Sequence, residues 1–222
     1  IKQNQGFEKA FETYAADCAK KSNCPLGTDP AKAATNFQAL SRPLIGHPVH
    51  TDDGRTLGYS DALTGVTMAL YSPDLWTALT KGLRELQQGN GTTLLALADV
   101  YEGRNPNGTY SNQSEAFVAI RCVDSPRVTD RARVGQIDTQ LRQIAPFADD
   151  GHGSGNAALD ACAFWPVPVT MTPAAVNAHG LPRVVVVSTT HDPATPYQAG
   201  VDLAKQLHAE LITFNGTQHT VS

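Results

Sequence analysis

The most constraining feature of the sequence is the segment Val184–His219, in which two strand patterns flank a helical pattern. Val184–Thr189 is a run of valines that ends in hydroxyl residues, a composition typical of a strand buried on both faces of a parallel sheet. Apolar residues then recur at helical spacing between Tyr197 and Leu207, and a second short strand is expected at Leu211–Phe214. The order strand, turn, helix, strand predicts a parallel α/β unit.

An acid and an imidazole follow these two strands. Asp192 comes after the first strand and His219 after the second. Because the carboxyl ends of parallel strands meet at one edge of the sheet, where ligands and chemistry are found, the two side chains are predicted to be neighbours. A carboxylate bound to one imidazole nitrogen leaves the other nitrogen free to deprotonate a nucleophile. The alternative is that Asp192 caps the following helix and His219 is a surface residue, and position alone does not decide between the two.

The nucleophile for such a pair is missing from the sequence. In α/β-hydrolases the serine, acid and histidine follow one another along the chain, so the serine is expected upstream of Asp192. Ser154 lies in a glycine-rich stretch with the wrong spacing for G-x-S-x-G, and Ser188 lies inside the predicted strand. The chain also begins without Met and ends three residues after His219. We therefore expect it to be a piece of a longer precursor whose earlier part carries the serine.

The residues before the valine strand show mostly helical patterns. Helices are expected at about 5–20, 29–40, 60–71, 72–88, 92–101, 114–122 and 129–144, with a short one at 157–164 and a turn or small hairpin at 49–57. In the first helix Phe7, Phe11, Tyr14 and Cys18 share one face, which we interpret as core or as the wall of a cap. Two strands do not make a stable sheet, so the other strands are also expected before Ile1.

Charge and composition exclude several classes of function. A net charge of −4 and the lack of a Lys/Arg cluster argue against a nucleic-acid partner. The sequence contains no apolar run long enough for a membrane span and no recognisable targeting signal. No cofactor or metal is expected, because adjacent residues such as His191 and Asp192 point in opposite directions on an extended backbone and do not readily share one ion.

Four cysteines are present, at Cys18, Cys24, Cys122 and Cys162. None forms a C-x-x-C pair, which argues against a structural zinc site. The even number favours two disulfides and an oxidising compartment, with Cys18 paired to Cys24 and Cys122 to Cys162 as the preferred of three connectivities. Four free thiols in a cytosolic protein is the alternative.

The segment from Val184 onward resembles the C-terminal part of the secreted tripeptidyl-aminopeptidase-like α/β-hydrolases of actinobacteria, including mycobacterial cell-envelope members. The resemblance rests on Asp192-Pro193-Ala194-Thr195-Pro196 and on Gly216-Thr217-Gln218-His219-Thr220, and it extends to the cysteine-bearing segments around residues 17–27, 119–124 and 162–166. His191 and Gln218 stand where this family often has glycine, which affects access to the acid and base rather than their presence.

The resemblance implies a fold, a site and a function. The fold is the last strand–helix–strand of an α/β-hydrolase core at residues 157–222, preceded by a mostly helical cap, or lid, at residues 1–156. The implied site has Asp192 as triad acid and His219 as general base, with Thr195 holding the acid loop. The implied function is that of a serine hydrolase of peptidase type in the cell envelope or outside the cell, with a peptide or protein substrate and with the rest of the precursor as its partner. A carboxylesterase or lipase with the same triad, and a non-catalytic cap or scaffold, are the alternatives.

Overall fold

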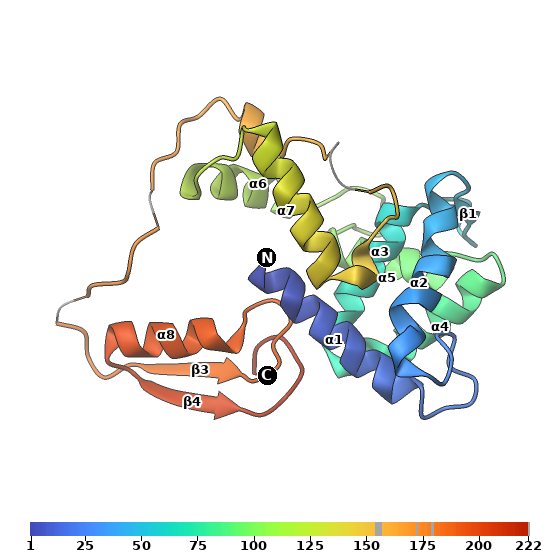
Figure 1. Cartoon of the computed structure of the whole chain (residues 1–222), viewed down its shortest axis with the longest axis horizontal. Helices are drawn as coiled ribbons and strands as arrows, with labels where there is room; N and C mark the ends of the chain where they lie inside the picture. Colours follow the sequence, from blue (N-terminus) through green and yellow to red (C-terminus); the bar gives the residue numbers. More distant parts are fainter. Residues whose placement is uncertain (154–156, 172, 179, 222) are drawn as a thin grey trace.

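The computed structural model describes residues 1–153, 157–171, 173–178 and 180–221, in which a helical region is followed by one small α/β unit (Figure 1). The helices of the first region are α1 Lys2–Cys18, α2 Ala33–Ser41, α3 Tyr59–Leu70, α4 Trp76–Gln87, α5 Thr92–Tyr101, α6 Gln113–Asp124 and α7 Arg131–Ile144. Short 3-10 turns occur at Pro30–Lys32, Arg42–Ile45, Pro73–Leu75, Pro146–Ala148 and Ala161–Phe164. The C-terminal unit consists of β3 Val185–Thr189, α8 Tyr197–Leu207 and β4 Glu210–Phe214.

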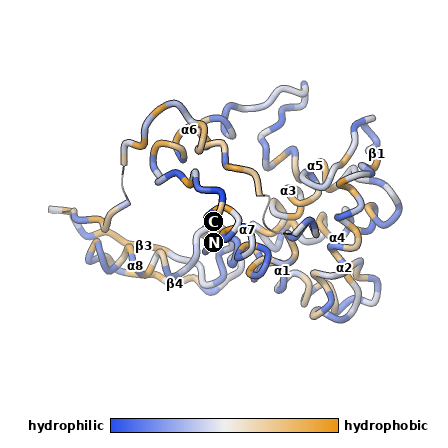
Figure 2. The backbone as a smooth tube through the Cα atoms, turned by 45° about the horizontal axis from the view of Figure 1, so that its top comes forward, coloured by the Kyte–Doolittle hydropathy of each residue, from blue (hydrophilic) through white to orange (hydrophobic). Residues whose placement is uncertain are grey.

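The aromatic stripe of α1 lies in the core of the helical region. Phe7, Phe11, Tyr14 and Cys18 are all buried. Phe11 stacks on Phe147 with a centroid distance of 4.9 Å and contacts Phe37 at 5.7 Å. Burial of each such ring contributes roughly 1.5–3 kcal/mol to the free energy of folding. Because this gain requires the aromatic face of α1 to point inward, the polar residues of the same helix face solvent. The mixture of hydrophobic and hydrophilic residues along the helices is visible in Figure 2.

Helices α3 and α5 pack closely through a glycine. A Cβ at Gly65 would lie 2.3 Å from the Leu94 carbonyl oxygen, so only glycine permits this approach of the two helices. The packing fixes the C-terminal end of α3, after which Tyr71 forms the cap residue. This end of α3 lies beside the C-terminal unit, because the backbone N–H of His219 donates to the Tyr71 carbonyl at 2.8 Å.

The segment around Asp53–Gly54 forms a small hairpin rather than an isolated turn. Strands β1 Val49–His50 and β2 Thr56–Leu57 pair antiparallel, and Gly54 adopts a φ of 82° in the turn. Arg55 donates to both carboxylate oxygens of Asp99 at 2.9 and 2.6 Å, which ties the hairpin to α5.

Helices α6 and α7, which we call the α6–α7 arm (residues 113–144), are joined to the chain that follows by the Cys122–Cys162 disulfide. The short helix expected at residues 157–164 is wrong in extent, because only Ala161–Phe164 forms a 3-10 turn. The Asp160 side chain accepts from the Cys162 N–H at 2.8 Å and so begins the turn, and Pro166 prevents its continuation. Ser154 and the boundary expected after residue 156 fall at residues 154–156, outside the described residues.

The C-terminal unit is a parallel two-stranded sheet with α8 on one face. Val185 pairs with Glu210 and Thr189 with Phe214, so the two strands end level with each other. A Cβ at Gly200 of α8 would lie 2.6 Å from the Ser188 Cβ, which places α8 against that face. On the other face Val187 and Ile212 are each 49% exposed. Within the described residues, the expectation of a strand buried on both faces is therefore wrong, because α8 covers one face of the sheet and the other face is exposed.

Within the described residues, no helix combines the length and the apolar character that crossing a bilayer would require.

Glu8 gives α1 a pH-dependent effect on stability. Burial raises the pKa of Glu8 to about 7, although the Phe147 N–H, which donates to its carboxylate at 3.2 Å, opposes this shift. Between the ordinary pKa of 4.5 and about 7 the folded protein holds a proton that the unfolded chain has lost. The free energy of unfolding therefore falls as pH rises through this interval, and the loss is complete above it.

Replacing Glu8 with Gln in the full-length protein is expected to raise the free energy of unfolding by about 1–2 kcal/mol at pH 8 and by less at pH 5. Gln keeps an acceptor for the Phe147 N–H and removes the cost of ionisation. Thermal unfolding at both pH values measures the difference, with Glu115→Gln, at an exposed position of α6, as the control. An equal gain for Glu8→Gln at both pH values would contradict this account.

Candidate active site

The β3–α8–β4 unit brings Asp192 and His219 together, as their places after the two strands predict. The ladder continues beyond the strands, because the Thr190 N–H donates to the Phe214 carbonyl at 2.9 Å and the His191 N–H to the Gly216 carbonyl at 3.0 Å. Both loops therefore leave the same edge of the sheet side by side. His219 Nδ1 lies 3.0 Å from Asp192 Oδ1 and 3.1 Å from Oδ2.

The carboxylate of Asp192 is buried and fully engaged by donors. Its side chain is 3% exposed. The backbone N–H groups of Ala194 and Thr195 donate to Oδ1 at 2.9 and 2.7 Å, and that of Thr220 donates to Oδ2 at 3.1 Å. Burial favours the neutral acid, but the hydrogen bonds from Thr195, His219 and Thr220 outweigh it, so the pKa of Asp192 lies below its ordinary value. Asp192 is thus held as an anion.

An anion at Nδ1 determines what the imidazole can do. The ionised carboxylate of Asp192 can accept hydrogen bonds but cannot donate one. The neutral tautomer of His219 that fits this contact therefore has its proton on Nδ1 and a lone pair on Nε2. The His219 side chain is 30% exposed, which leaves part of it open to another group. The pair therefore consists of a base at Nε2 and a buried negative charge that stabilises the imidazolium when that base accepts a proton.

Thr195 and Thr220 complete the surroundings of the pair. Thr195 holds the carboxylate through its backbone N–H, and its hydroxyl Oγ1 lies 3.4 Å from His219 Nδ1. Thr220 has a φ of 62°. This left-handed conformation costs a β-branched residue on the order of 1 kcal/mol or more, and it accompanies the hydrogen bond from the Thr220 N–H to Asp192.

Three residues of the helical region, Gln3, Gly6 and Tyr71, contact the acid loop or the base. A Cβ at Gly6 of α1 would lie 2.4 Å from the Pro193 carbonyl oxygen, so α1 packs directly on the acid loop. Gln3 Nε2 donates to the Ala194 carbonyl of the same loop at 3.3 Å. The ring of Tyr71, after α3, lies edge-on to the imidazole with centroids 5.2 Å apart. Only the unexplained glycine inside α1 offered a hint, since glycine lowers helix propensity.

The four cysteines form the two disulfides in the preferred connectivity. Cys18 is joined to Cys24 with a Cα–Cα distance of 5.4 Å, and Cys122 to Cys162 with one of 4.9 Å. Among the described residues, the one cluster of potential metal ligands consists of Cys122, Asp160 and Cys162. Its two sulfur atoms are bonded to each other, so they offer no thiolate to an ion.

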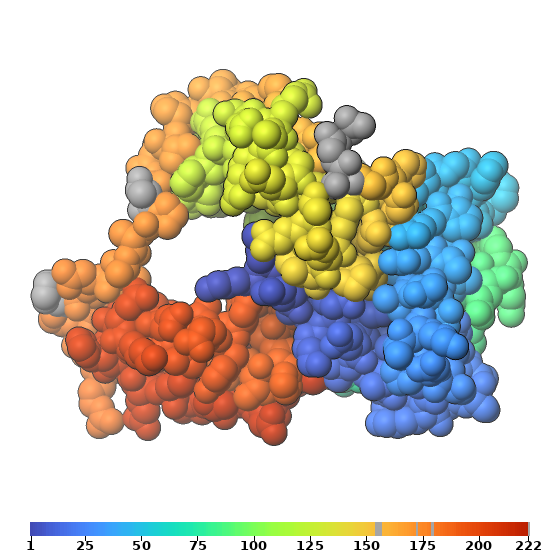
Figure 3. Space-filling model, viewed as in Figure 1, coloured from blue at the N-terminus to red at the C-terminus, as the bar shows by residue number. Residues whose placement is uncertain are grey.

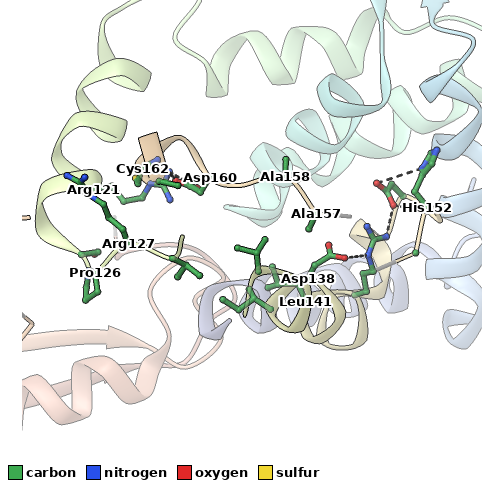
Figure 4. A pocket seen from close by; sticks show the side chains of 18 residues that line it. Arg121, Pro126, Arg127, Asp138, Leu141, His152, Ala157, Ala158, Asp160 and Cys162 are labelled. Carbon is green, nitrogen blue, oxygen red and sulfur yellow. Dashed lines mark hydrogen bonds and ion pairs between the residues drawn. The ribbon is translucent and has the colours of Figure 1, made fainter. Parts of the chain in front are cut away.

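A cavity of about 650 Å³ lies beside α7 (Figure 4). Leu141 and Asp138 of α7 line one wall, and Ala157 and Ala158 line the wall opposite. The Asp138 carboxylate is engaged by Arg142 Nε at 3.0 Å. The lining contains neither Asp192 nor His219. In the space-filling view an open gap separates the α6–α7 arm from the C-terminal unit (Figure 3).

Comparison with known proteins finds one family profile and several curated relatives that the chain is similar to. The sequence profile of the family described as "TAP-like protein" matches residues 148–222. The whole chain is 57% identical to "Serine protease Hip1" of Mycobacterium tuberculosis and covers 44% of its length. It is 54% identical to "Carboxylesterase B" of the same species, with 99% of the chain and 42% of that relative aligned.

A more distant similarity exists to "Tripeptidyl aminopeptidase" of Streptomyces lividans, at 26% identity over 72% of the chain and 30% of that protein. The chain thus spans less than half the length of the curated relatives it matches. The mostly helical region followed by a strand–helix–strand unit agrees with the expected C-terminal portion of an α/β-hydrolase with a helical cap.

Proposed function

We propose that the protein is a serine hydrolase of peptidase type. The starting point is the match of residues 148–222 to the TAP-like family of α/β-hydrolases. The observation that carries this proposal is the contact between His219 Nδ1 and the buried carboxylate of Asp192 at 3.0 Å. In this role Asp192 is the triad acid and His219 the general base. The names of the relatives, a serine protease and a carboxylesterase, support the same class of reaction.

The chemistry follows from the pair. Nε2 of His219 takes the proton of a serine hydroxyl while the serine oxygen attacks the acyl carbon, and Asp192 stabilises the imidazolium that results. His219 then gives this proton to the leaving amine or alcohol as the acyl–leaving-group bond breaks. A water molecule then gives a proton to the same nitrogen and attacks the acyl carbon, and His219 returns that proton to the serine oxygen as the acyl–serine bond breaks.

The serine belongs, in this proposal, to a part of the full-length protein outside residues 1–222. No serine of the sequence stands in a G-x-S-x-G motif, and the relatives are more than twice as long as the chain. The partner of the chain is then the N-terminal part of its own polypeptide, which also supplies the remaining strands and the oxyanion hole.

Residues 1–156 act as a cap in this proposal, and residues 157–222 as the C-terminal part of the catalytic core. The contacts of Gly6 and Tyr71 with the acid and base loops support this division. A cap in this place selects substrates by shaping the entrance and excludes water during acyl transfer.

Thr195 is assigned a supporting role. Its backbone N–H donates the shortest of the hydrogen bonds to the Asp192 carboxylate, at 2.7 Å. Its hydroxyl oxygen lies 3.4 Å from His219 Nδ1. Thr195 thus orients both members of the pair rather than the acid loop alone.

Ester hydrolysis is the second candidate function, favoured by the 54% identity to a protein named carboxylesterase. The same triad cleaves esters and amides, and amides demand more help for the leaving group. Relative turnover of a peptide amide and a short acyl ester that share one acyl group separates a peptidase from an esterase.

The proposed location is outside the cytoplasm, in the cell envelope or secreted. Two disulfides close loops that span residues 18–24 and 122–162. Such bonds persist in oxidising compartments and are rare in the cytosol.

A fluorophosphonate probe tests the proposed function directly. The full-length protein is expected to be labelled at one serine, and peptide mapping is expected to place that serine outside residues 1–222. Heat-denatured protein is the control, because an unactivated serine does not react. The absence of labelling, which a non-catalytic scaffold would give, or labelling of a serine within this chain would overturn the proposal.

A further inference from the structure

Tyr71 stands at the point where the helical region meets His219. It follows α3, whose C-terminal carbonyls have no partner within the helix. The Tyr71 carbonyl accepts the backbone N–H of His219 at 2.8 Å, although the two residues are far apart in sequence. His219 lies beyond the end of β4, where ladder hydrogen bonds no longer fix the backbone. The end of α3 therefore holds the main chain of the base.

The side chain of Tyr71 contacts the imidazole as well. The two rings are nearly perpendicular, at 82°, with centroids 5.2 Å apart, which is a favoured geometry for aromatic pairs. Asp192 engages the Nδ1 edge of the same imidazole at 3.0 Å. The imidazole of His219 thus has two neighbours, the Asp192 carboxylate at its Nδ1 edge and the ring of Tyr71 beside it.

Tyr71 is itself held in place from two directions. Phe7 of α1 lies 5.3 Å from its ring and Tyr101 of α5 lies 6.1 Å from it. Burial, together with smaller contributions from Tyr101 and Asp192, raises the pKa of Tyr71 to about 12, so the phenol stays neutral beside the Asp192 carboxylate. The neighbours that hold this ring belong to α1 and α5, so the orientation of the imidazole depends on the helical region.

We propose that Tyr71 is a positioning residue for the general base, keeping the His219 imidazole in the orientation that faces Asp192. The proposal rests on the function proposed above, because it gives Tyr71 a role only if His219 acts as a base. It assigns the helical region a part in catalysis beyond covering the site. The ring of Tyr71, rather than its hydroxyl, carries this role, because the ring is what contacts the imidazole.

The test uses four variants of the full-length protein: Tyr71→Leu, Tyr71→Met, Tyr71→Phe and Phe37→Leu. Leu and Met remove the aromatic ring, Met with better filling of the space, while Phe retains it. Phe37 is fully buried in the aromatic core and makes no aromatic contact with His219, so Phe37→Leu is a matched loss of one buried ring. The measurements are kcat and KM for a small ester substrate, and Tm.

Tyr71→Leu and Tyr71→Met are expected to lower kcat about tenfold with KM changed less than about threefold, because a misplaced base slows chemistry more than binding. Tyr71→Phe is expected to keep kcat within about twofold, and Phe37→Leu to lower Tm without lowering kcat. Wild-type kcat in both Tyr71→Leu and Tyr71→Met, or an equal loss in Phe37→Leu, would overturn the role of Tyr71.

His219→Ala separates this inference from the proposed function. If His219→Ala is inactive while the Tyr71 variants turn over normally, the positioning role fails and the proposed function stands. If His219→Ala turns over normally, the proposed function fails, and the role of Tyr71 fails with it.

Discussion

His219→Ala in the full-length protein is expected to lower kcat about 10⁴-fold or more, and Asp192→Asn about 10⁴-fold, with folding preserved. Alanine removes the imidazole that contacts the buried carboxylate and that accepts the proton of the serine hydroxyl in this proposal. Asn is nearly isosteric with Asp but carries no charge, so it neither stabilises the imidazolium nor selects the tautomer with a free Nε2. The single Asn oxygen still accepts from the Ala194 and Thr195 N–H groups, which donate to Oδ1 of Asp192, whereas the Thr220 N–H, which donates to Oδ2, loses its acceptor.

Steady-state rates on an aminoacyl ester and a peptide amide measure these losses, and thermal unfolding checks that the variants are folded. His47→Ala is the control, because His47 is also an exposed histidine and lies outside the pair and its two loops. Near wild-type turnover by either His219→Ala or Asp192→Asn would rule out the triad assignment. A double variant is expected to be no slower than His219→Ala by itself, since the acid acts through the base.

Gly6→Ala is expected to lower kcat by up to about 100-fold while the protein stays folded. The new Cβ would lie 2.4 Å from the Pro193 carbonyl oxygen and 3.0 Å from its carbonyl carbon, both of them backbone atoms that have no rotamer with which to move away. The acid loop, α1 or both must therefore shift by about 1 Å, a displacement that misplaces a catalytic group. Alanine is meanwhile favoured over glycine inside a helix by about 1 kcal/mol, so stability and activity are expected to change independently.

Gly46→Ala is the control for this change, because no described atom lies within 4 Å of a Cβ at that position. It is expected to leave kcat unchanged. The comparison of kcat and Tm across Gly6→Ala, Gly46→Ala and the wild type shows whether the approach of α1 to Pro193 matters for chemistry. Unchanged kcat in Gly6→Ala would mean that the acid loop tolerates the shift or that α1 takes all of it.

The sequence predicted those features that depend on neighbours along the chain. The stripe Phe7, Phe11 and Tyr14 predicted a buried helix face because helical periodicity is local, and the valine run predicted β3 for the same reason. The sequence also predicted that Asp192 and His219 lie close together, because each follows a strand and parallel strands end at the same edge of a sheet. Their hydrogen bonds are described by the structure, whereas their catalytic roles stay predictions.

Other features depend on residues that meet only after folding. Nothing near Tyr71 indicates that its carbonyl and ring contact His219, because that contact is set by the packing of α3 on α5 through Gly65. The exposed side of β3 was mispredicted. A run of valines indicates that a strand is suited to burial on both faces, but it does not show which residues cover each face. The helix expected at residues 157–164 was reduced to one turn by the cap at Asp160.

The level ends of β3 and β4 make the geometry of the acid and base insensitive to the length of α8. Thr189 and Phe214 form one rung of the ladder, and Asp192 and His219 are each placed by a short loop that starts from it. A change in the helix that preserves this pairing leaves both loops where they were. A one-residue slip of β4 would instead carry His219 along the strand by about 3.3 Å, farther than a hydrogen bond to Asp192 can stretch. We therefore expect insertions and deletions in α8 to leave the contact between Asp192 and His219 intact. Insertions and deletions between Phe214 and His219 are expected to break it.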